Sequence, residues 1–277
     1  MTNIVSLSKF AVIKLSGEQS HSFLQGQVTC NVDDISKRDW QAGAHCNAKG
    51  KAWSTFVAFE QDNDIYLIMT KESAEPSLAE LKKYGVFSKT EISDDSSNWH
   101  LYGTTEAHSE LKSIELAPNH FLILSRQMID GCEQDDGSWW YNEVMSGRAH
   151  LFANTSGEYV PQMINLQALN YISFNKGCYM GQEMVARMRY LGKNKRALYI
   201  AEIDGEYELT PGYDVYKAMN GNRRSAGKVI NSAFFNGKTV FQLVLPNDTD
   251  LTDTIYLDSE NDEQLRLLPL PYSLEQD

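Results

Sequence analysis

The hydrophobic positions in the first 130 residues follow two different spacings, which indicates a mixture of strands and helices. Short apolar runs bounded by polar turns predict strands. Leu78, Leu81 and Tyr84 lie three residues apart and predict a helix. Strands are expected at 10–15, 42–47, 53–59, 65–69, 89–93, 99–103 and 121–125, with further helices after residue 19 and over 106–112. This alternation occurs twice and predicts two similar α+β units.

The pattern between residues 131 and 192 is less regular. A strand is expected over 139–144, and a long structured loop over 149–170. A helix is expected from about Cys178 to Leu191, because Gly192 is a typical residue at a helix end.

Beyond Arg196 the apolar runs are shorter and are separated by turn residues, which predicts a small β-barrel or sandwich over 196–277. The turn pairs are Asp204-Gly205, Asn220-Gly221 and Asn236-Gly237. Asn-Gly between apolar strands favours a hairpin because both residues tolerate a positive φ. The acidic stretch over 248–263 is expected to be a solvated loop.

The composition is that of an ordinary globular protein. The 277 residues are 42% hydrophobic and 22% charged, which excludes collagen, coiled coil and wholesale disorder and suits two globular units. There is no apolar run of about 18 residues and no signal-peptide pattern, so we expect a cytoplasmic protein without a membrane span. A net charge of −12 argues against nucleic-acid binding over the whole surface. The four cysteines form no C-x-x-C pair, so we expect free thiols and no metal site.

Residues 176–183, Lys-Gly-Cys-Tyr-Met-Gly-Gln-Glu, are the segment whose residues best suit a reactive or binding site. Gly177 permits a tight turn or the close approach of a ligand. Cys178 falls near the expected helix start, where free N–H groups and the helix dipole favour an anion, and Lys176 adds a positive charge. Both effects would favour a reactive thiolate. The alternative is that Cys178 is a small buried apolar residue.

Basic residues are concentrated around this segment. Residues 176–196 contain six basic residues and one acidic residue. The basic part, 187–196, is either a solvated helix face or an anion site for a phosphate, a polyglutamate tail or an RNA backbone.

Further motifs accompany this segment along the whole chain. They are Gln25-Gly26-Gln27-Val28-Thr29, Ala-His-Cys-Asn-Ala-Lys-Gly-Lys over 44–51, Leu-Lys-Lys-Tyr-Gly-Val-Phe-Ser-Lys over 81–89, Pro161-Gln162 with 165–169, and Pro-Leu-Pro-Tyr over 269–272. With the K-G-C-Y-x-G-Q-E signature at 176–183, the chain resembles the YgfZ group of bacterial folate-binding proteins linked to tRNA modification. These proteins are relatives of the T-protein of the glycine cleavage system.

The resemblance implies an α+β fold of the T-protein-like (aminomethyltransferase folate-binding) type around a central opening. Residues 1–195 would hold two α+β units, the second at roughly 50–130 inserted in the first, and 196–277 a C-terminal β-barrel. The implied function is that of a folate-binding accessory or regulatory protein. It would support iron–sulfur enzymes such as tRNA methylthiotransferases and act indirectly on replication initiation. The implied partners are non-covalent tetrahydrofolate or another reduced folate, these enzymes, and tRNA through 187–196, with the protein itself a monomer.

The resemblance also assigns residues. Cys178 would be the functional thiol, and the folate contacts would be Phe10, Trp139, Lys176, Gly177, Tyr179, Gln182 and Glu183. Phe10 stands where the family has a tryptophan, so it keeps an aromatic face but lacks the indole N–H. Met145 stands where T-protein relatives use a carboxylate to hold the pterin ring, and Glu143 lies two positions earlier.

Three other functions are compatible with parts of the sequence. A folate-dependent aminomethyl transferase would need a carboxylate in the stretch 50–55, where this chain has the hydroxyls of Ser54 and Thr55. A cysteine hydrolase would pair Cys178 with His45 or His150. A protein-interaction scaffold would need no small ligand.

Overall fold

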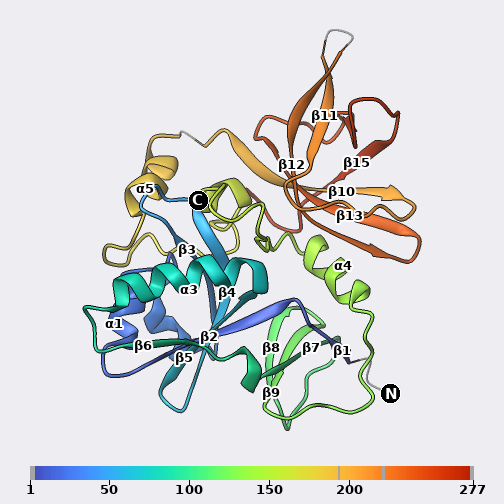
Figure 1. Ribbon diagram of the computed structural model, residues 1–277. Helices are drawn as coiled ribbons and strands as arrows, with labels where there is room; N and C mark the ends of the chain where they lie inside the picture. The colour runs from blue at the N-terminus through green and yellow to red at the C-terminus, as the bar shows by residue number, and fades with distance from the viewer. Residues whose placement is uncertain (1–3, 193, 220–221, 275–277) are drawn as a thin grey trace.

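The structure is a computed structural model that describes residues 4–192, 194–219 and 222–274. These residues form two antiparallel sheets and a closed barrel, placed around a common centre (Figure 1). The expected α+β fold with a C-terminal barrel is therefore confirmed. Among the described residues there is no helix that is both long and apolar enough to cross a membrane.

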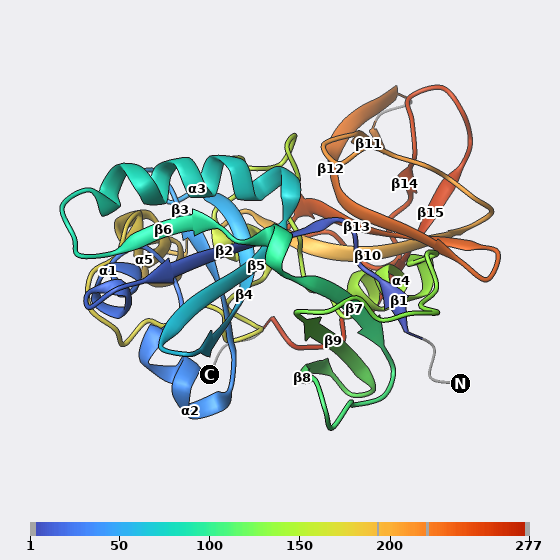
Figure 2. The ribbon, with the colours of Figure 1, turned by 60° about the horizontal axis from the view of Figure 1, so that its bottom comes forward.

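The first sheet has five strands in the order β3, β4, β5, β2, β6. Helix α3 crosses it (Figure 2), and the side chains of Leu15, Leu67 and Leu81 are fully buried in the core of this unit. The strands are β2 (Phe10–Ser16), β3 (Gln41–Cys46), β4 (Ala52–Gln61), β5 (Asp64–Thr70) and β6 (Glu91–Asp94), and the helices are α1 (Ser20–Gln25), α2 (Ile35–Arg38) and α3 (Lys71–Gly85).

The second sheet has four strands in the order β1, β7, β9, β8. They are β1 (Val5–Ser6), β7 (His100–Thr104), β8 (Lys112–Ala117) and β9 (His120–Ser125). Strand β1 precedes the first sheet in the chain but pairs with β7, Val5 opposite Gly103, so the first residues tie the two sheets together. All strands between 52 and 94 belong to the first sheet, so no sheet boundary lies near residue 50. The domain limits themselves stay a prediction.

The barrel closes in the order β10, β13, β12, β11, β14, β15. Its strands are β10 (Arg196–Asp204), β11 (Asp214–Met219), β12 (Asn222–Phe235), β13 (Lys238–Pro246), β14 (Ile255–Tyr256) and β15 (Gln264–Leu268). Asn236 and Gly237 both have positive φ and connect the β12–β13 hairpin as expected. Asp204-Gly205 is not a hairpin turn, because β10 pairs with β13 and β15 rather than with β11. Asn220-Gly221 lies outside the described residues.

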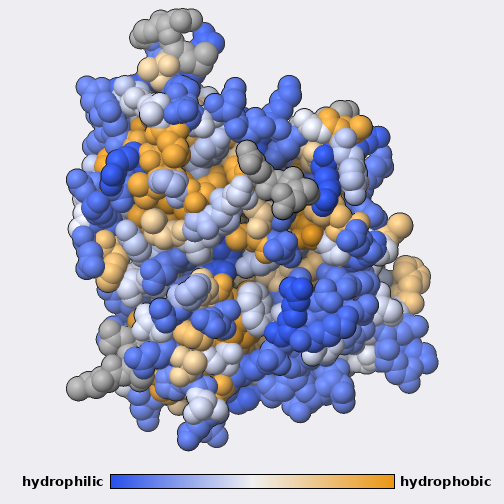
Figure 3. Space-filling view, turned by 180° about the vertical axis from the view of Figure 1, so that it is seen from behind, coloured by the Kyte–Doolittle hydropathy of each residue, from blue (hydrophilic) through white to orange (hydrophobic). Residues whose placement is uncertain are grey.

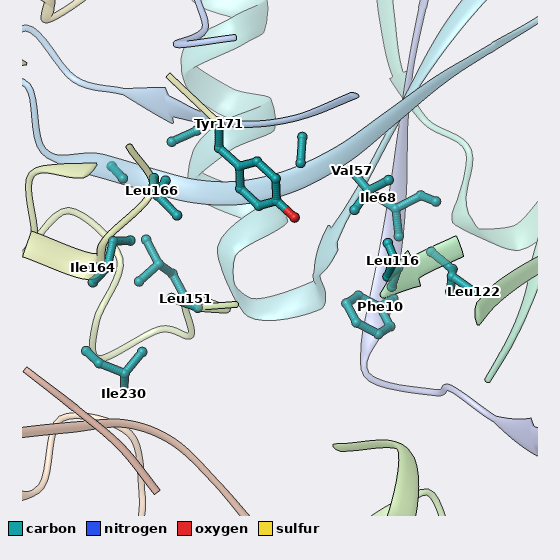
Figure 4. Close-up of a cluster of buried hydrophobic side chains, with 14 of the residues drawn as sticks. Phe10, Val57, Ile68, Leu116, Leu122, Leu151, Ile164, Leu166, Tyr171 and Ile230 are labelled. Atoms are coloured by element: carbon teal, nitrogen blue, oxygen red, sulfur yellow. The ribbon is translucent and has the colours of Figure 1, made fainter. Parts of the chain in front are cut away.

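One hydrophobic core joins all three parts. Phe10 from the first sheet, Leu122 from the second and Ile230 from the barrel belong to it (Figure 4). Leu151, Leu166 and neighbouring residues of the long segment before α5 fill the space between them. Seen from behind, apolar side chains reach the surface mainly over the barrel and towards the middle of the face (Figure 3).

Three local expectations were wrong. Residues 139–144 lie in helix α4 (Gly137–Met145), where Trp139, Trp140, Glu143 and Val144 are buried at helical spacing. The aromatic residues in this stretch favour a strand locally, and they led to the wrong prediction. Burial of one helix face outweighs that local propensity. Residues 106–111 form turns rather than a helix, and β8 begins at Lys112. Helix α5 (Gln182–Tyr190) begins four residues beyond Cys178, after Gly181 adopts a positive φ.

Candidate functional site

Three of the sequence motifs meet at the loop before α5. The Met180 N–H donates to the carbonyl of Gly26 at 3.0 Å. A methyl group on Gly181 would lie 2.5 Å from the carbonyl oxygen of Asn47, so only glycine allows this approach. A methyl group on Gly50 would lie 2.7 Å from the Cβ of Met184 in α5, so Gly50 allows a similarly close approach. The loop at 174–181, called the thiol loop below, is therefore fixed against the first sheet and its connections.

Lys176 tethers the other side of the thiol loop. Its ammonium donates to the carbonyls of Val28 at 2.8 Å and Cys30 at 2.6 Å. Burial lowers the pKa of Lys176 to about 8, and burial raises the pKa of the Cys30 thiol to about 12. The ammonium is thus bonded to backbone carbonyls of the first unit.

Cys178 lies between these two anchors and is exposed. The alternative of a buried apolar cysteine is wrong. The expected position at a helix start is also wrong, because α5 begins at Gln182. What the fold provides is an accessible sulfur on a fixed backbone.

The other signature residues divide into two groups. Tyr179 is buried, burial raises its pKa, and its backbone N–H is 3.3 Å from the side-chain oxygen of Gln182. These two side chains support the loop from inside. Glu183 is exposed and pairs with Arg187 at 2.7 Å, and a methyl group on Gly177 would meet no atom within 4 Å. There is therefore open space where a side chain on Gly177 would begin.

The two aromatic residues expected to contact folate lie together elsewhere. Phe10 and Trp139 are both buried, with ring centroids 5.7 Å apart and the rings nearly perpendicular. Phe10 also stacks on Trp140, with the ring centroids 5.3 Å apart. Edge-to-face contact at this distance leaves no slot between the rings for a third flat ring.

A cavity of about 320 Å³ borders Trp139, but not Phe10, between the second sheet and α4. Gly103 makes room for Trp139, because a methyl group there would lie 2.1 Å from the indole. The cavity is also lined by Thr104, His120, Glu133 and Asn142, and no residue of the thiol loop is among its lining residues. The structure therefore separates the expected site residues into two places.

Sequence reasoning missed the role of Glu143. Its buried carboxylate accepts from Arg148 at 2.9 Å, His120 at 2.5 Å and His150 at 2.6 Å. Burial would raise the pKa of Glu143, but the Arg148 charge and the two histidine hydrogen bonds hold it well below its usual range. Both oxygens are occupied, so Glu143 does not replace the missing pterin carboxylate at Met145. The only sequence signal was a group of charged residues in an apolar stretch.

The alternative chemistries find no support in this geometry. His45 is buried, its ring nitrogen bonds the Ser77 hydroxyl at 2.7 Å, and burial lowers its pKa to about 4. His150 is bonded to Glu143. The hydroxyls of Ser54 and Thr55 bond Ser77 at 3.0 Å and the Ala149 carbonyl at 2.7 Å. Neither histidine is available to an exposed thiol, and neither hydroxyl supplies an anion.

The comparisons with known proteins fit this architecture. No protein-family model matches the chain. The fold is similar to the glycine cleavage system aminomethyltransferase T from Bartonella henselae, with a TM-score of 0.67 and 11% identity over 95% of this chain and 83% of that one. The structure thus has the T-protein-like fold.

The sequence relatives define the family within that fold. The chain is 36% identical to the tRNA-modifying protein YgfZ of Colwellia psychrerythraea over 99% of its length and 94% of the relative. It is 33% identical to the protein of that name from Escherichia coli, over 99% and 94%, and 31% to that from Vibrio atlanticus, over 98% and 92%. The chain belongs to the YgfZ family of tRNA-modifying proteins.

Proposed function

We propose that this protein is a cytoplasmic, monomeric, folate-binding accessory factor for tRNA modification. In this role it supports iron–sulfur enzymes such as tRNA methylthiotransferases, and it acts on replication initiation only indirectly. The name shared by the relatives supports the role in tRNA modification, and the T-protein-like fold supports a folate ligand.

The observation that carries this proposal is the exposed sulfur of Cys178 on a loop anchored from both sides. An accessory thiol has to reach another molecule, so it needs exposure and a fixed backbone. A self-contained enzyme would need a general base or carboxylate beside the sulfur. Within the described residues, the histidines suggested for that task bond other side chains.

We assign the flat ring of the folate to the cavity beside Trp139. A volume of about 320 Å³ is at the lower end for small-ligand sites, which suits a pterin ring with the rest of the folate outside. The Glu133 carboxylate can accept two parallel hydrogen bonds from a pterin, as the carboxylate does in T-protein relatives. Within the described residues, the buried Nδ1 of His120 has no hydrogen-bond partner, so it offers a polar contact to a ligand.

The role of the thiol is tested in cells that carry this chain as their only YgfZ protein. Cys178→Ala should fold normally and lower the 2-methylthio nucleosides of total tRNA several-fold, measured by liquid chromatography and mass spectrometry. Cys132→Ala is the matched control, because Cys132 is a partly exposed thiol outside the signature. Normal nucleoside levels with Cys178→Ala would overturn the role of the thiol.

The folate site is tested by isothermal titration with tetrahydrofolate. Hydrogen bonds to charged groups contribute about 1.5–3 kcal/mol, so Glu133→Gln should weaken binding by about 10- to 150-fold. Glu115→Gln is the control, because this exposed glutamate is not among the residues that line the cavity. Equal tetrahydrofolate affinity in both variants would refute the assignment of the folate ring to this cavity.

A further inference from the structure

Two adjacent apolar side chains are exposed at the turn that follows α3. Phe87 is 94% exposed and Val86 is 70% exposed. Burying a large apolar side chain stabilises a folded protein, and neither of these two side chains is buried. Large apolar side chains that are exposed side by side do not stabilise the fold, and they indicate a surface that contacts another molecule.

Hydrogen bonds fix the backbone of this turn, so the fold itself holds Val86 and Phe87 exposed. The Ser88 N–H and its hydroxyl both donate to the Gly85 carbonyl at 2.9 Å. The Lys89 N–H donates to the Gln19 side chain at 2.7 Å. These bonds hold the turn on α1 while Phe87 projects outward.

The turn lies at the same end of the molecule as the thiol loop, as Figures 1 and 2 show from two directions. Helix α1 connects them: Phe23 lies beside Gly85, and the Gly26 carbonyl accepts from Met180. Helix α5 follows the thiol loop, and its Arg189 lies over the ring of Phe174 in that loop. The helix ends at Tyr190, which is 68% exposed, and the next residue, Leu191, is 59% exposed. Together the segments 47–51, 85–89, 175–181 and 187–191 are called the end face.

The charge of the end face is opposite to that of the whole protein. Its segments contain six basic residues and no acidic residue, in a chain of net charge −12. They are Lys49, Lys51, Lys89, Arg187, Arg189 and Lys176, and the ammonium of Lys176 is already bonded to the carbonyls of Val28 and Cys30, so the other five form the basic rim. Lys89 and Arg187 pair with Glu18 and Glu183 of neighbouring segments, and all four side chains are more than half exposed, so these pairs are weak.

We propose that the end face docks a partner protein that presents an apolar patch rimmed by acidic residues, with Phe87 as the anchor. The basic rim gives the charge complementarity, which directs association and orientation. Val86 and Leu191 are aliphatic and lack the π-face on which nucleic-acid bases stack, which favours a protein partner over RNA. The proposal rests on the proposed function, since the docked partner is the client that Cys178 serves.

The first test compares Phe87→Asp with Leu251→Asp in the cells described above. Leu251 is 47% exposed in the acidic loop of the barrel, so both variants place an acid at an exposed apolar position. Both should keep the melting temperature of the natural chain. Phe87→Asp should lower the methylthio nucleosides at least five-fold, and Leu251→Asp should not. Normal levels with Phe87→Asp would overturn the docking face.

The second test identifies the molecule that binds to the end face. Benzoylphenylalanine in place of Phe87 should crosslink to a protein in cells, and the same probe in place of Leu251 should not. The captured protein, once purified, should bind the Phe87→Asp chain about 10-fold more weakly than the natural chain, a typical effect of losing an interface anchor. An adduct with RNA or with a second copy of this chain would overturn the proposal.

The two proposals fail in different ways. The adduct should persist when Cys178→Ala is combined with the probe, because docking needs no sulfur. A persistent adduct with normal nucleosides in Cys178→Ala would refute the thiol role alone. A missing adduct with low nucleosides in Cys178→Ala would refute the docking face alone.

Discussion

Glu143→Gln removes the charge at the centre of a buried network that connects α4, the second sheet and the segment before α5. Glu143 is inaccessible to solvent, and its two oxygens accept from one arginine and two histidines. The Arg148 guanidinium also donates to the Leu116 carbonyl at 2.8 Å. Glutamine keeps the size of the side chain but leaves Arg148 without its counter-charge in the interior.

The expected cost follows from this burial. Breaking a buried ion pair by removing one partner costs about 3–5 kcal/mol, because the remaining charge stays desolvated. The unfolding entropy of a chain of this length is roughly 0.6 kcal/mol per kelvin on the usual per-residue value, so the melting temperature should fall by about 5–9 °C. Glu115→Gln, at an exposed position on β8, should change it by less than about 1 °C.

The pH dependence gives a second readout. The pKa of Glu143 is held well below its ordinary value, so its contribution is present above the unfolded pKa of about 4.3 and is lost as the pH falls through the folded pKa. Urea denaturation of both proteins should therefore show a stability difference that holds at pH 5–7 and shrinks in stronger acid. A difference below about 1 kcal/mol at pH 7 would refute the argument that Glu143 neutralises a buried arginine.

Further predictions concern glycines and the lysine tether. Burial lowers the pKa of Lys176 to about 8, so the unfolded chain binds more protons between pH 8 and 10. Urea stability should rise over that range relative to Lys176→Met, and a constant difference would contradict the burial of the ammonium. Gly177→Ala should change stability by less than about 0.5 kcal/mol, whereas Gly181→Ala, at φ +79° and against a carbonyl, should cost more than about 2 kcal/mol by the same assay. Equal effects would count against the loop geometry. Gly103→Ala should displace the indole of Trp139 and shift its fluorescence, and an unchanged spectrum would contradict that contact.

Much of the fold follows from local sequence signals. The strands β3, β4 and β5 are almost entirely buried, and short continuous apolar runs in the sequence predict them. Helix α3 is predicted from apolar residues at helical spacing. The β12–β13 hairpin is predicted from Asn236-Gly237, because its φ values depend only on these two residues. The family follows from motifs distributed over the whole chain.

The candidate site was only partly predictable. The motif at 176–183 identified Cys178, but its exposure depends on a helix that begins at Gln182 and on carbonyls of Val28 and Cys30 about 150 residues earlier in the chain. The position of Trp139 beside the cavity depends on Gly103 of β7, whose missing side chain makes room for the indole. No local pattern contains such pairs, because the residues involved are far apart in sequence.

The sequence by itself determined the family, the order of most elements and the presence of a cysteine in a basic segment, because these depend on composition and on neighbours within a few residues. The tertiary structure decided that Trp139 lies on a helix, that Glu143 neutralises Arg148, and that the thiol and the aromatic cavity lie in separate places. These depend on desolvation and packing between distant segments, and burial energy of this kind outweighs local propensity.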